Sequence, residues 1–354
     1  MQPKHLTIGG FTLRRLVTNT TVLILAVFIF CPFSWGKSKP KSKSVYLLGT
    51  ICSIALHDKG SDAILDEAFN IVRDIDLKMG MGSENSEIQK VNTASGSSPL
   101  KISADTFAVI KSGVKFAKLS QGRFDITVGP LVTLWGIGMK NARVPGQQEI
   151  DKAMTLIGID SIVLQEEGHK VLLKKPGMKL DLGGIAKGYA ADAAAGYLKT
   201  RGVTRAIIDF GGNIFVLGSK AADKPWRVGI QHPHKKRGAY IGVIPLSNKA
   251  VVTSGKYERF FEVGGKQYHH IFDTSTGYPV VNNLSSVTLI ADDSMTADAM
   301  STAVFAAGLT EGLKLVEAYK GIEAVVVTED GLVHLSSGLV GLFKIANPEF
   351  RLAQ

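Results

Sequence analysis

Apolar residues along this chain repeat at two spacings, and the order of the two patterns constrains the fold more than any other feature. Runs with a period of two, typical of strands, occur in groups between segments with the 3.6-residue period of helices. Strands grouped in this way pair as hairpins, whereas a parallel sheet needs a crossover after each strand. The pattern therefore predicts an α+β fold with mixed or antiparallel sheets and packed helices.

The predicted helices have the ordinary spacing of helices that pack on a core; in residues 64–79, Leu65, Phe69 and Val72 share one face. The other helices are predicted at 104–120, 187–201, 295–307 and 311–318. The strands are predicted at 45–57, 161–165, 170–174, 205–210, 214–217, 226–231, 241–247, 250–254, 259–263, 286–290, 324–328 and 332–335.

Residues 1–36 have the pattern of an export signal. Lys4, Arg14 and Arg15 form a positive start, and Val22–Phe30 is an unbroken apolar run of nine residues. A membrane-spanning helix needs about 20 apolar residues, so this run is short for a permanent anchor. We predict cleavage after Gly36 and an exported protein, with an uncleaved anchor as the alternative.

The 2 cysteines predict no disulfide. Cys31 lies in the leader and follows bulky residues instead of the small ones that precede a lipidated cysteine. Cleavage after Gly36 leaves Cys52 as the only thiol, within the apolar run TICSIAL. We expect Cys52 to be a buried small hydrophobic residue.

The net charge of +10 does not indicate a nucleic-acid-binding protein. Seven of these charges come from three basic residues of the leader and four lysines in residues 37–43. We assign 37–44 to a Lys/Ser linker, 45–348 to a single domain and 349–354 to a tail. Because the excess charge precedes the domain, no basic face for nucleic acid is predicted.

The segment MKLDLGGIAKGYAADAAAGYL has the outline of a phosphate cradle. A short strand ends at Asp181, two glycines allow a ligand to approach the backbone, and the positive end of an Ala-rich helix follows near Lys187. The spacing is neither that of a Walker loop nor that of a dinucleotide-binding fold. Taken alone, a glycine turn with a surface lysine explains the segment equally well.

The segment MTADAMSTAVFAAG places two oxygen-bearing side chains on one helix face. Asp298 and Thr302 are four residues apart in an otherwise small and apolar segment. A carboxylate and a hydroxyl suit Mg²⁺, which takes its other ligands from phosphates and water. The alternative is that Asp298 only interacts with the helix dipole and Thr302 only packs.

The segment KQYHHIFDTSTGYPV offers a general base. A histidine titrates near neutral pH, and Asp273 is close enough in sequence to hold the ring of His270 in one tautomer. His269 and His270 point in opposite directions if this is a strand, so at most one of them faces a site.

Two further segments combine aromatic residues with glycines. In GRFDITVGPLVTLWGIG, Phe124 and Trp135 are candidates to frame a planar ring, although aromatic residues at such spacing more often belong to a core. In DFGGNI, Gly211, Gly212 and Asn213 offer a second close approach of the backbone to a ligand.

Taken together and in this order, these segments resemble the ApbE family, the FAD:protein FMN transferases. The matching segments are LLGT (Leu47–Thr50), SEIQKVN, GRFDITVGPLVTLWGIG, LDLGGIAKGYAAD, DFGGNI, VVTSGKYERFF, HHIFDTSTGYP and ADAMSTAVFAAG. The resemblance covers nearly the whole chain after the linker. It implies a T-fold-type architecture, Mg²⁺ as cofactor and FAD as donor substrate.

The resemblance also implies the roles of individual residues. Mg²⁺ would be held by Asp298, Thr302 and the carbonyl of Gly184, while His270 would deprotonate the acceptor hydroxyl with Lys187 as a second catalytic residue. The residues implied to contact the flavin nucleotide are Leu48, Arg123, Phe124, Asp125, Asp181, Lys187 and Phe272.

The implied reaction attaches FMN through a phosphoester to a Thr or Ser hydroxyl and releases AMP. The implied acceptor is an exported or membrane electron-transfer protein, such as a subunit of an ion-translocating NADH:quinone or ferredoxin oxidoreductase. The enzyme would then lie in the periplasm or on the periplasmic face of the inner membrane. Two alternatives keep the site: an FAD pyrophosphatase, or a periplasmic flavin-binding protein without catalysis.

The chain departs from the family pattern at three places. Many members have Met at the position of Leu48 and Asp at the position of Ser301, which removes one carboxylate near the implied metal. The segment MGMGSEN before Ser86 lacks the aromatic residue that this loop more usually contains.

Overall fold

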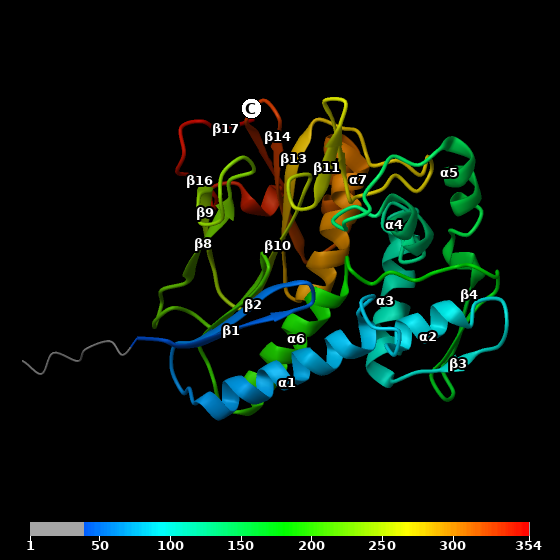
Figure 1. Ribbon diagram of the computed structural model, residues 1–354. Coiled ribbons are helices and arrows are strands. Elements are labelled where there is room, and N and C mark those ends of the chain that lie inside the picture. Colours follow the sequence, from blue (N-terminus) through cyan, green and yellow to red (C-terminus); the bar gives the residue numbers. More distant parts are fainter. Residues whose placement is uncertain (1–38, 354) are drawn as a thin grey trace, which may run out of the picture. The chain divides into compact units, whose positions relative to one another are not determined.

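A nine-stranded sheet organises the folded part of the chain (Figure 1). The structure is a computed structural model that describes residues 39–353. The strand order is β1-β2-β6-β7-β10-β13-β14-β15-β17, and only the last pair is parallel. The strands are β1 Lys41–Leu47, β2 Thr50–Leu56, β6 Ala206–Phe210, β7 Asn213–Leu217, β10 Lys249–Gly255, β13 Leu284–Ala291, β14 Ile322–Thr328, β15 Leu332–Leu335 and β17 Arg351–Leu352. The α+β prediction with mixed and antiparallel sheets is confirmed.

Three smaller sheets and seven α-helices complete the part of the chain that the structure describes. The smaller sheets are β8 Trp226–Gln231 with β9 Tyr240–Leu246 and β16 Lys344–Ile345; β3 Leu100–Lys101 with β4 Ile162–Gln165 and β5 Lys170–Leu173; and β11 Phe260–Val263 with β12 Lys266–His269. The helices are α1 Asp62–Met79, α2 Glu87–Thr93, α3 Ala104–Leu119, α4 Gly129–Trp135, α5 Gln147–Met154, α6 Ala186–Thr200 and α7 Ser294–Ala318.

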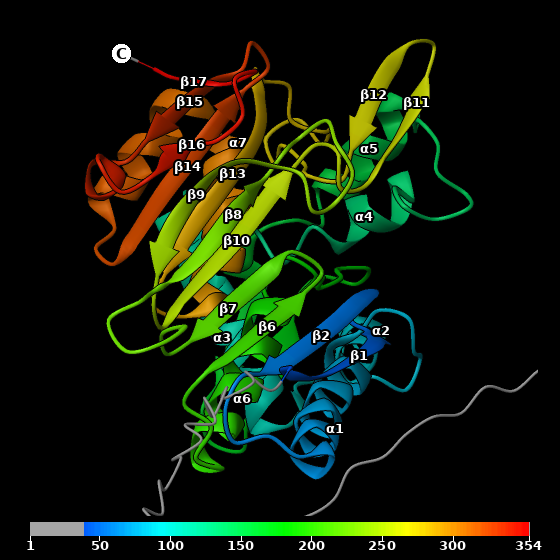
Figure 2. The same cartoon turned by 90° about the vertical axis from the view of Figure 1, so that its left-hand side faces the viewer.

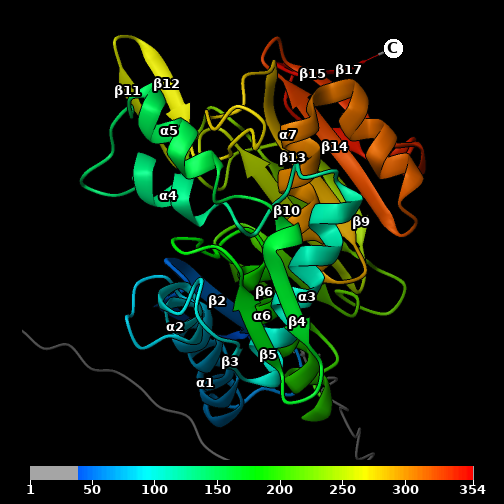
Figure 3. The ribbon, with the colours of Figure 1, turned by 90° about the vertical axis from the view of Figure 1, so that its right-hand side faces the viewer.

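Successive side chains along the central strands of the large sheet point alternately into two apolar cores, one on each face of the sheet. In β10, Ala250 and Val252 belong to the core on the helix side, whereas Val251 belongs to a second core on the other face. The β8–β9–β16 sheet covers that second face (Figure 2), and helices α6 and α7 lie on the first (Figure 3). Residues at either end of the central strands are thereby held in fixed positions.

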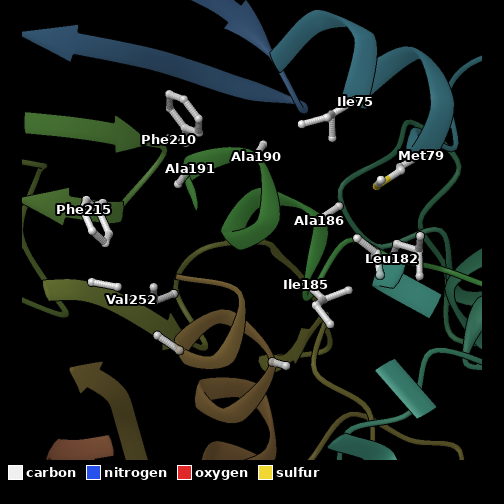
Figure 4. Packing of buried hydrophobic residues seen from close by; sticks show 14 of the residues in the cluster. Ile75, Met79, Leu182, Ile185, Ala186, Ala190, Ala191, Phe210, Phe215 and Val252 are labelled. Atoms are coloured by element: carbon white, nitrogen blue, oxygen red, sulfur yellow. The ribbon is translucent and has the colours of Figure 1, made fainter. Parts of the chain in front are cut away.

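Helix α6 lies in the middle of the helix layer because its buried face is made of alanines. Ala190 and Ala191 leave the helix narrow enough to pack between α1 and the sheet. Figure 4 shows these alanines between Phe210 of β6 and Ile75 of α1. This packing fixes the amino end of α6, where the glycine turn enters.

Helices α6 and α7 each provide a carboxylate that accepts hydrogen bonds from backbone amides at the amino end of the other helix. Asp192 of α6 accepts hydrogen bonds from the amides of Ser294 and Met295 at the start of α7, at 2.8 and 2.9 Å. In return, Asp298 of α7 accepts one from the amide of Gly188 in the first turn of α6, at 2.9 Å. Each helix therefore satisfies free amides of the other, at the end where a carboxylate is most favourable.

Gly188 is required by the close contact between these two helices. A Cβ at Gly188 would lie 2.4 Å from the carbonyl oxygen of Ser294. We expect Gly188→Ala to lower the free energy of unfolding by about 1–3 kcal/mol, because backbone must move to admit the methyl group. Urea unfolding measures this change.

Gly196 provides the matched control in the same helix. A Cβ at Gly196 would have nothing within 4 Å, so Gly196→Ala should raise stability by about 0.5–1 kcal/mol through helix propensity alone. Equal effects of the two substitutions would contradict the packing argument.

Several predicted element boundaries need correction. The predicted strand 45–57 is a hairpin of β1 and β2 that turns at Leu48 and Gly49, and β1 begins at Lys41, inside the assigned linker 37–44. The assigned tail 349–354 contains β17 and the buried Phe350. The break predicted between the helices 295–307 and 311–318 is confirmed, because α7 is interrupted by non-helical backbone at Gly308.

The leader lies outside the described residues, and so does the prediction of cleavage after Gly36. Within residues 39–353, no helix combines the length and the apolar character needed to span a bilayer. Cys52 is fully buried in the sheet, as predicted, and burial raises the pKa of its thiol to about 12.

Candidate functional site

One pocket of about 330 Å³ lies where the turns at the ends of the central strands face the amino ends of α6 and α7. A cavity of this size falls within the range of small-molecule sites. Its walls come from segments far apart in sequence, including the β1–β2 turn, the β6–β7 turn, β10 and α7. Several of the predicted segments therefore meet in one place.

The pocket brings together all the predicted site residues except one. Those that line it are Arg123, Phe124, Asp125, Asp181, Gly184, Lys187, His270, Phe272, Asp298 and Thr302. Leu48 is the exception: its side chain packs against the core, and its amide donates to Asp76 at 3.0 Å. The neighbouring Gly49 and Thr50 line the pocket instead.

Lys187 and Asp298 form an ion pair across the junction of the two helices. The Nζ atom of Lys187 lies 3.0 Å from Oδ1 of Asp298 and donates to the carbonyl of Gly183 at 3.0 Å. Asp298 is only 4% exposed. A buried carboxylate needs a positive partner, and here the ammonium group supplies it.

The oxygen atoms around Asp298 are of the kind that can hold a hard cation. Ser254 on β10 lies 3.4 Å from the Thr302 hydroxyl and 2.8 Å from that of Ser301, and a Cβ at Gly184 would lie 3.6 Å from the Thr302 hydroxyl. Among residues 39–353, no three His, Cys, Asp or Glu side chains cluster as a metal site. A single carboxylate with hydroxyl and carbonyl oxygens suits a cation that completes its shell with phosphate and water, as Mg²⁺ does.

The predicted phosphate cradle is partly occupied by the protein itself. The amide of Gly188 donates to Asp298, and the amide of Gly183 donates to Asp181 at 2.7 Å. These two groups therefore do not point at a ligand. Gly183, Gly184 and Lys187 nevertheless line the pocket, so the turn is one of its walls.

His270 faces the pocket with a defined tautomer, and His269 faces away from it. His269 is buried, and its Nε2 lies 2.9 Å from the carbonyl oxygen of Val280. The Nδ1 atom of His270 lies 3.2 Å from the carbonyl oxygen of Arg259, to which only a protonated Nδ1 can donate. The other ring nitrogen is then left as a proton acceptor.

Two predictions from the sequence about these segments are wrong. Asp273 does not orient His270; its carboxylate accepts from the amide and hydroxyl of Ser275. Trp135 does not frame the pocket, because this last residue of α4 is fully buried against Tyr268 of β12 and donates to the carbonyl of Gly277. Phe124 does line the pocket, as predicted.

Burial and neighbouring charge shift several ionisable groups in the pocket wall. Burial lowers the pKa of His270, and the Arg259 charge lowers it further, to about 3. Burial raises the pKa of Asp181, against the stabilising bond from the Gly183 amide. Burial likewise raises the pKa of Glu258, opposed by Arg237, whose guanidinium lies 3.9 Å away. Opposed shifts of this kind are characteristic of reactive sites.

Four further residues line the pocket without a mark in the sequence: Arg237, Ser254, Glu258 and Arg259. Arg237 belongs to the basic run HPHKKRG, which has the composition of a solvent-exposed loop. Its guanidinium donates to the carbonyl of Gly211 at 2.6 Å. The other three residues lie within VVTSGKYERFF, where the only available signal was the resemblance to a family.

Comparison with known proteins gives a consistent result. The ApbE family model matches residues 48–326. A FAD:protein FMN transferase of Klebsiella pneumoniae is 34% identical over 296 residues, which are 84% of this chain and 92% of the relative. One of Treponema pallidum is 33% identical over 328 residues, 88% of this chain and 91% of the relative.

Two solved structures have the same fold. The ApbE protein of Thermotoga maritima superposes with a TM-score of 0.78 and 34% identity, over 86% of this chain and 99% of the other. The flavin transferase ApbE of Vibrio cholerae superposes with a TM-score of 0.75 and 28% identity, also over 86% and 99%.

Proposed function

Because this chain belongs to the ApbE family, we infer that it is an FAD:protein FMN transferase and that the pocket is its active site. The observation that carries this inference is the placement of His270 in the same pocket as Lys187 and Asp298. A base for the acceptor and charges for the donor phosphates are both needed for phosphoryl transfer, and here they face one cavity.

We propose that the pocket acts on FAD as donor with Mg²⁺ held by Asp298, Thr302 and the Gly184 carbonyl. When bound, the metal would supply positive charge to the phosphates and to the departing AMP. Asp298 is a buried carboxylate that needs a positive partner, and Mg²⁺ would take over this role from the Lys187 ammonium. Many members have Asp at the position of Ser301. Here the Ser301 hydroxyl donates a hydrogen bond to the backbone carbonyl of Asp298 and adds no negative charge to the proposed metal site.

The chain's own groups then account for the transfer. His270 takes the proton of the acceptor hydroxyl on the ring nitrogen that Arg259 leaves free. The hydroxyl oxygen forms a bond to the FMN phosphorus, and the bond from that phosphorus to the AMP oxygen breaks. Lys187, which lines the pocket, would hold the phosphates in line, and such positioning provides most of the acceleration in reactions of this class.

The acceptor that we propose is a Thr or Ser of an exported or membrane electron-transfer protein, such as a subunit of an ion-translocating NADH:quinone or ferredoxin oxidoreductase. Export is supported by the apolar run Val22–Phe30 behind a positive start. The proposed location is the periplasm or the periplasmic face of the inner membrane.

A single assay tests the proposal against its alternatives. The protein is incubated with FAD, Mg²⁺ and such a subunit, and the products are read by in-gel flavin fluorescence and by release of AMP. A fluorescent subunit with an equal amount of AMP is expected. Free FMN with AMP would instead identify a pyrophosphatase, and bound intact FAD would identify a non-catalytic flavin-binding protein.

A further inference from the structure

Asn213 is a buried side chain in the pocket wall with half of its hydrogen-bonding capacity unused. It is the first residue of β7, it is 1% exposed, and it lines the pocket next to the Gly211–Gly212 turn. The hydroxyl of Ser294, at the start of α7, donates to its Oδ1. Its Nδ2 has no hydrogen-bond partner among the described residues.

An orphaned donor of this kind is costly in the free protein. A buried amide NH₂ group without a partner loses its hydration, and nothing in the fold replaces it. Asn92, by contrast, is a buried asparagine with both ends in use, since it donates to the carbonyl of Leu180 and accepts from its amide. The unused group of Asn213 is therefore available to a partner from outside the chain.

The surroundings of Asn213 indicate the chemistry of that partner. Ser294, which holds Asn213, is also the residue whose carbonyl contacts Gly188 in the first turn of α6. Asn213 thus lies beside the junction of α6 and α7, where Lys187 and Asp298 meet. A donor at this end of the pocket is suited to the oxygen of an anionic group.

We propose that Nδ2 of Asn213 binds a phosphate oxygen of the FAD donor, so that the substrate completes the hydrogen bonding of a polar group that the fold leaves unpaired. The proposal rests on the proposed function, because it takes FAD as the ligand. It assigns to Asn213 a substrate-binding role that is separate from the metal ligands and from His270.

Binding measured without turnover tests the assignment. The dissociation constants of FAD and of riboflavin, which has no phosphate, are measured by flavin fluorescence in chelator for the wild type and for Asn213→Ala. We expect Asn213→Ala to weaken FAD binding by about tenfold or more, the usual value of a hydrogen bond to a charged group, and to leave riboflavin binding unchanged. Equal weakening of both ligands, or of neither, would overturn the proposal.

Two further variants keep the test decisive if Asn213→Ala is unstable. Asn213→Asp keeps the acceptor for Ser294 but turns a negative oxygen toward the ligand, so it should weaken FAD binding more than Asn213→Ala does. The double variant Asn213→Leu with Ser294→Ala removes the hydrogen-bonded pair together and should fold well, while it still loses affinity for FAD and not for riboflavin.

Asn92→Leu is the matched control outside the pocket. It breaks two satisfied hydrogen bonds to the backbone of Leu180, so it should lower stability clearly in urea unfolding. The fraction that remains folded should bind FAD as the wild type does. Failure of the wild type itself to bind FAD would refute the proposed function, whereas normal binding by the Asn213 variants would refute only this assignment.

Discussion

Asp298→Asn is expected to reduce FMN transfer by about a thousandfold or more while the protein stays folded. The variant removes the only carboxylate of the proposed magnesium site, but its amide oxygen can still accept from Gly188 at the amino end of α6. Transfer is measured as flavin fluorescence on the acceptor subunit, and Mg²⁺ affinity by titration. Asp298→Ala should lose transfer equally and also lose stability, because Gly188 then has no acceptor.

Asp192→Asn is the control for this substitution. Asp192 is the corresponding carboxylate of α6, and it accepts hydrogen bonds from the amides of Ser294 and Met295 at the start of α7. It does not line the pocket, so its replacement should affect stability without changing the dependence on Mg²⁺. Transfer at the wild-type rate by Asp298→Asn in the presence of chelator would refute the assignment of the metal site.

His270→Gln is expected to lower the rate of transfer by about 10²–10⁴-fold, the usual contribution of a general base. Glutamine fills similar space but cannot take up a proton from the acceptor hydroxyl. The affinity for FAD should change little, because the proposed phosphate contacts come from other residues. Single-turnover transfer and equilibrium FAD binding are measured on the same preparation, and an unchanged transfer rate would exclude His270 as the base.

The protonation state of His270 can be tested separately. Because the pKa of this ring is lowered to about 3, the ligand-free protein should hold it neutral throughout the range from pH 5 to 8. A neutral ring is the form that accepts a proton, although the lowered pKa also makes this ring a weaker base than an ordinary histidine. Imidazole NMR signals, assigned with the His270→Gln variant, report this directly, and a midpoint near the ordinary value of 6.5 would contradict it.

Much of the fold could be predicted because most elements have a regular apolar period. The helix predicted at 64–79 is α1, Asp62–Met79, and the strand predicted at 226–231 is β8. Periodicity failed where a two-residue turn lies inside an apolar run, as at Leu48 and Gly49. The buried positions change there from odd numbers in β1 to even numbers in β2, and the single predicted strand 45–57 missed this shift. It also failed for α4 and α5, which have 7 and 8 residues and are too short to show a helical period.

The linker was predicted to extend to residue 44, although β1 begins at Lys41, because the first residues of this strand are polar. Lys41 and Lys43 look like linker residues, yet they lie in an edge strand and pair with Asp62 and Asp66 of α1. Charged side chains are common on edge strands because they discourage pairing with other chains. From the sequence alone, such a strand cannot be told from a solvated Lys/Ser segment.

The candidate site was predictable where glycines or a helix face marked a residue, as for Gly184, Asp298 and Thr302. Arg237 carries no such mark, since its place in the pocket depends on a loop between β8 and β9. The role of Arg259 toward His270 uses a backbone carbonyl, which every residue has. Contacts of this kind arise from tertiary structure and leave no trace in residue type.

The carboxylate–amide hydrogen bonds between α6 and α7 have a practical consequence for finding the natural substrates. Anything that binds at Asp298 or Lys187 binds only while these two helices are docked, so occupancy and folding are thermodynamically linked. Melting temperature should therefore rise in proportion to the logarithm of free nucleotide or cation concentration. Candidate donors and metals can be ranked by thermal shift, with no acceptor protein in the tube.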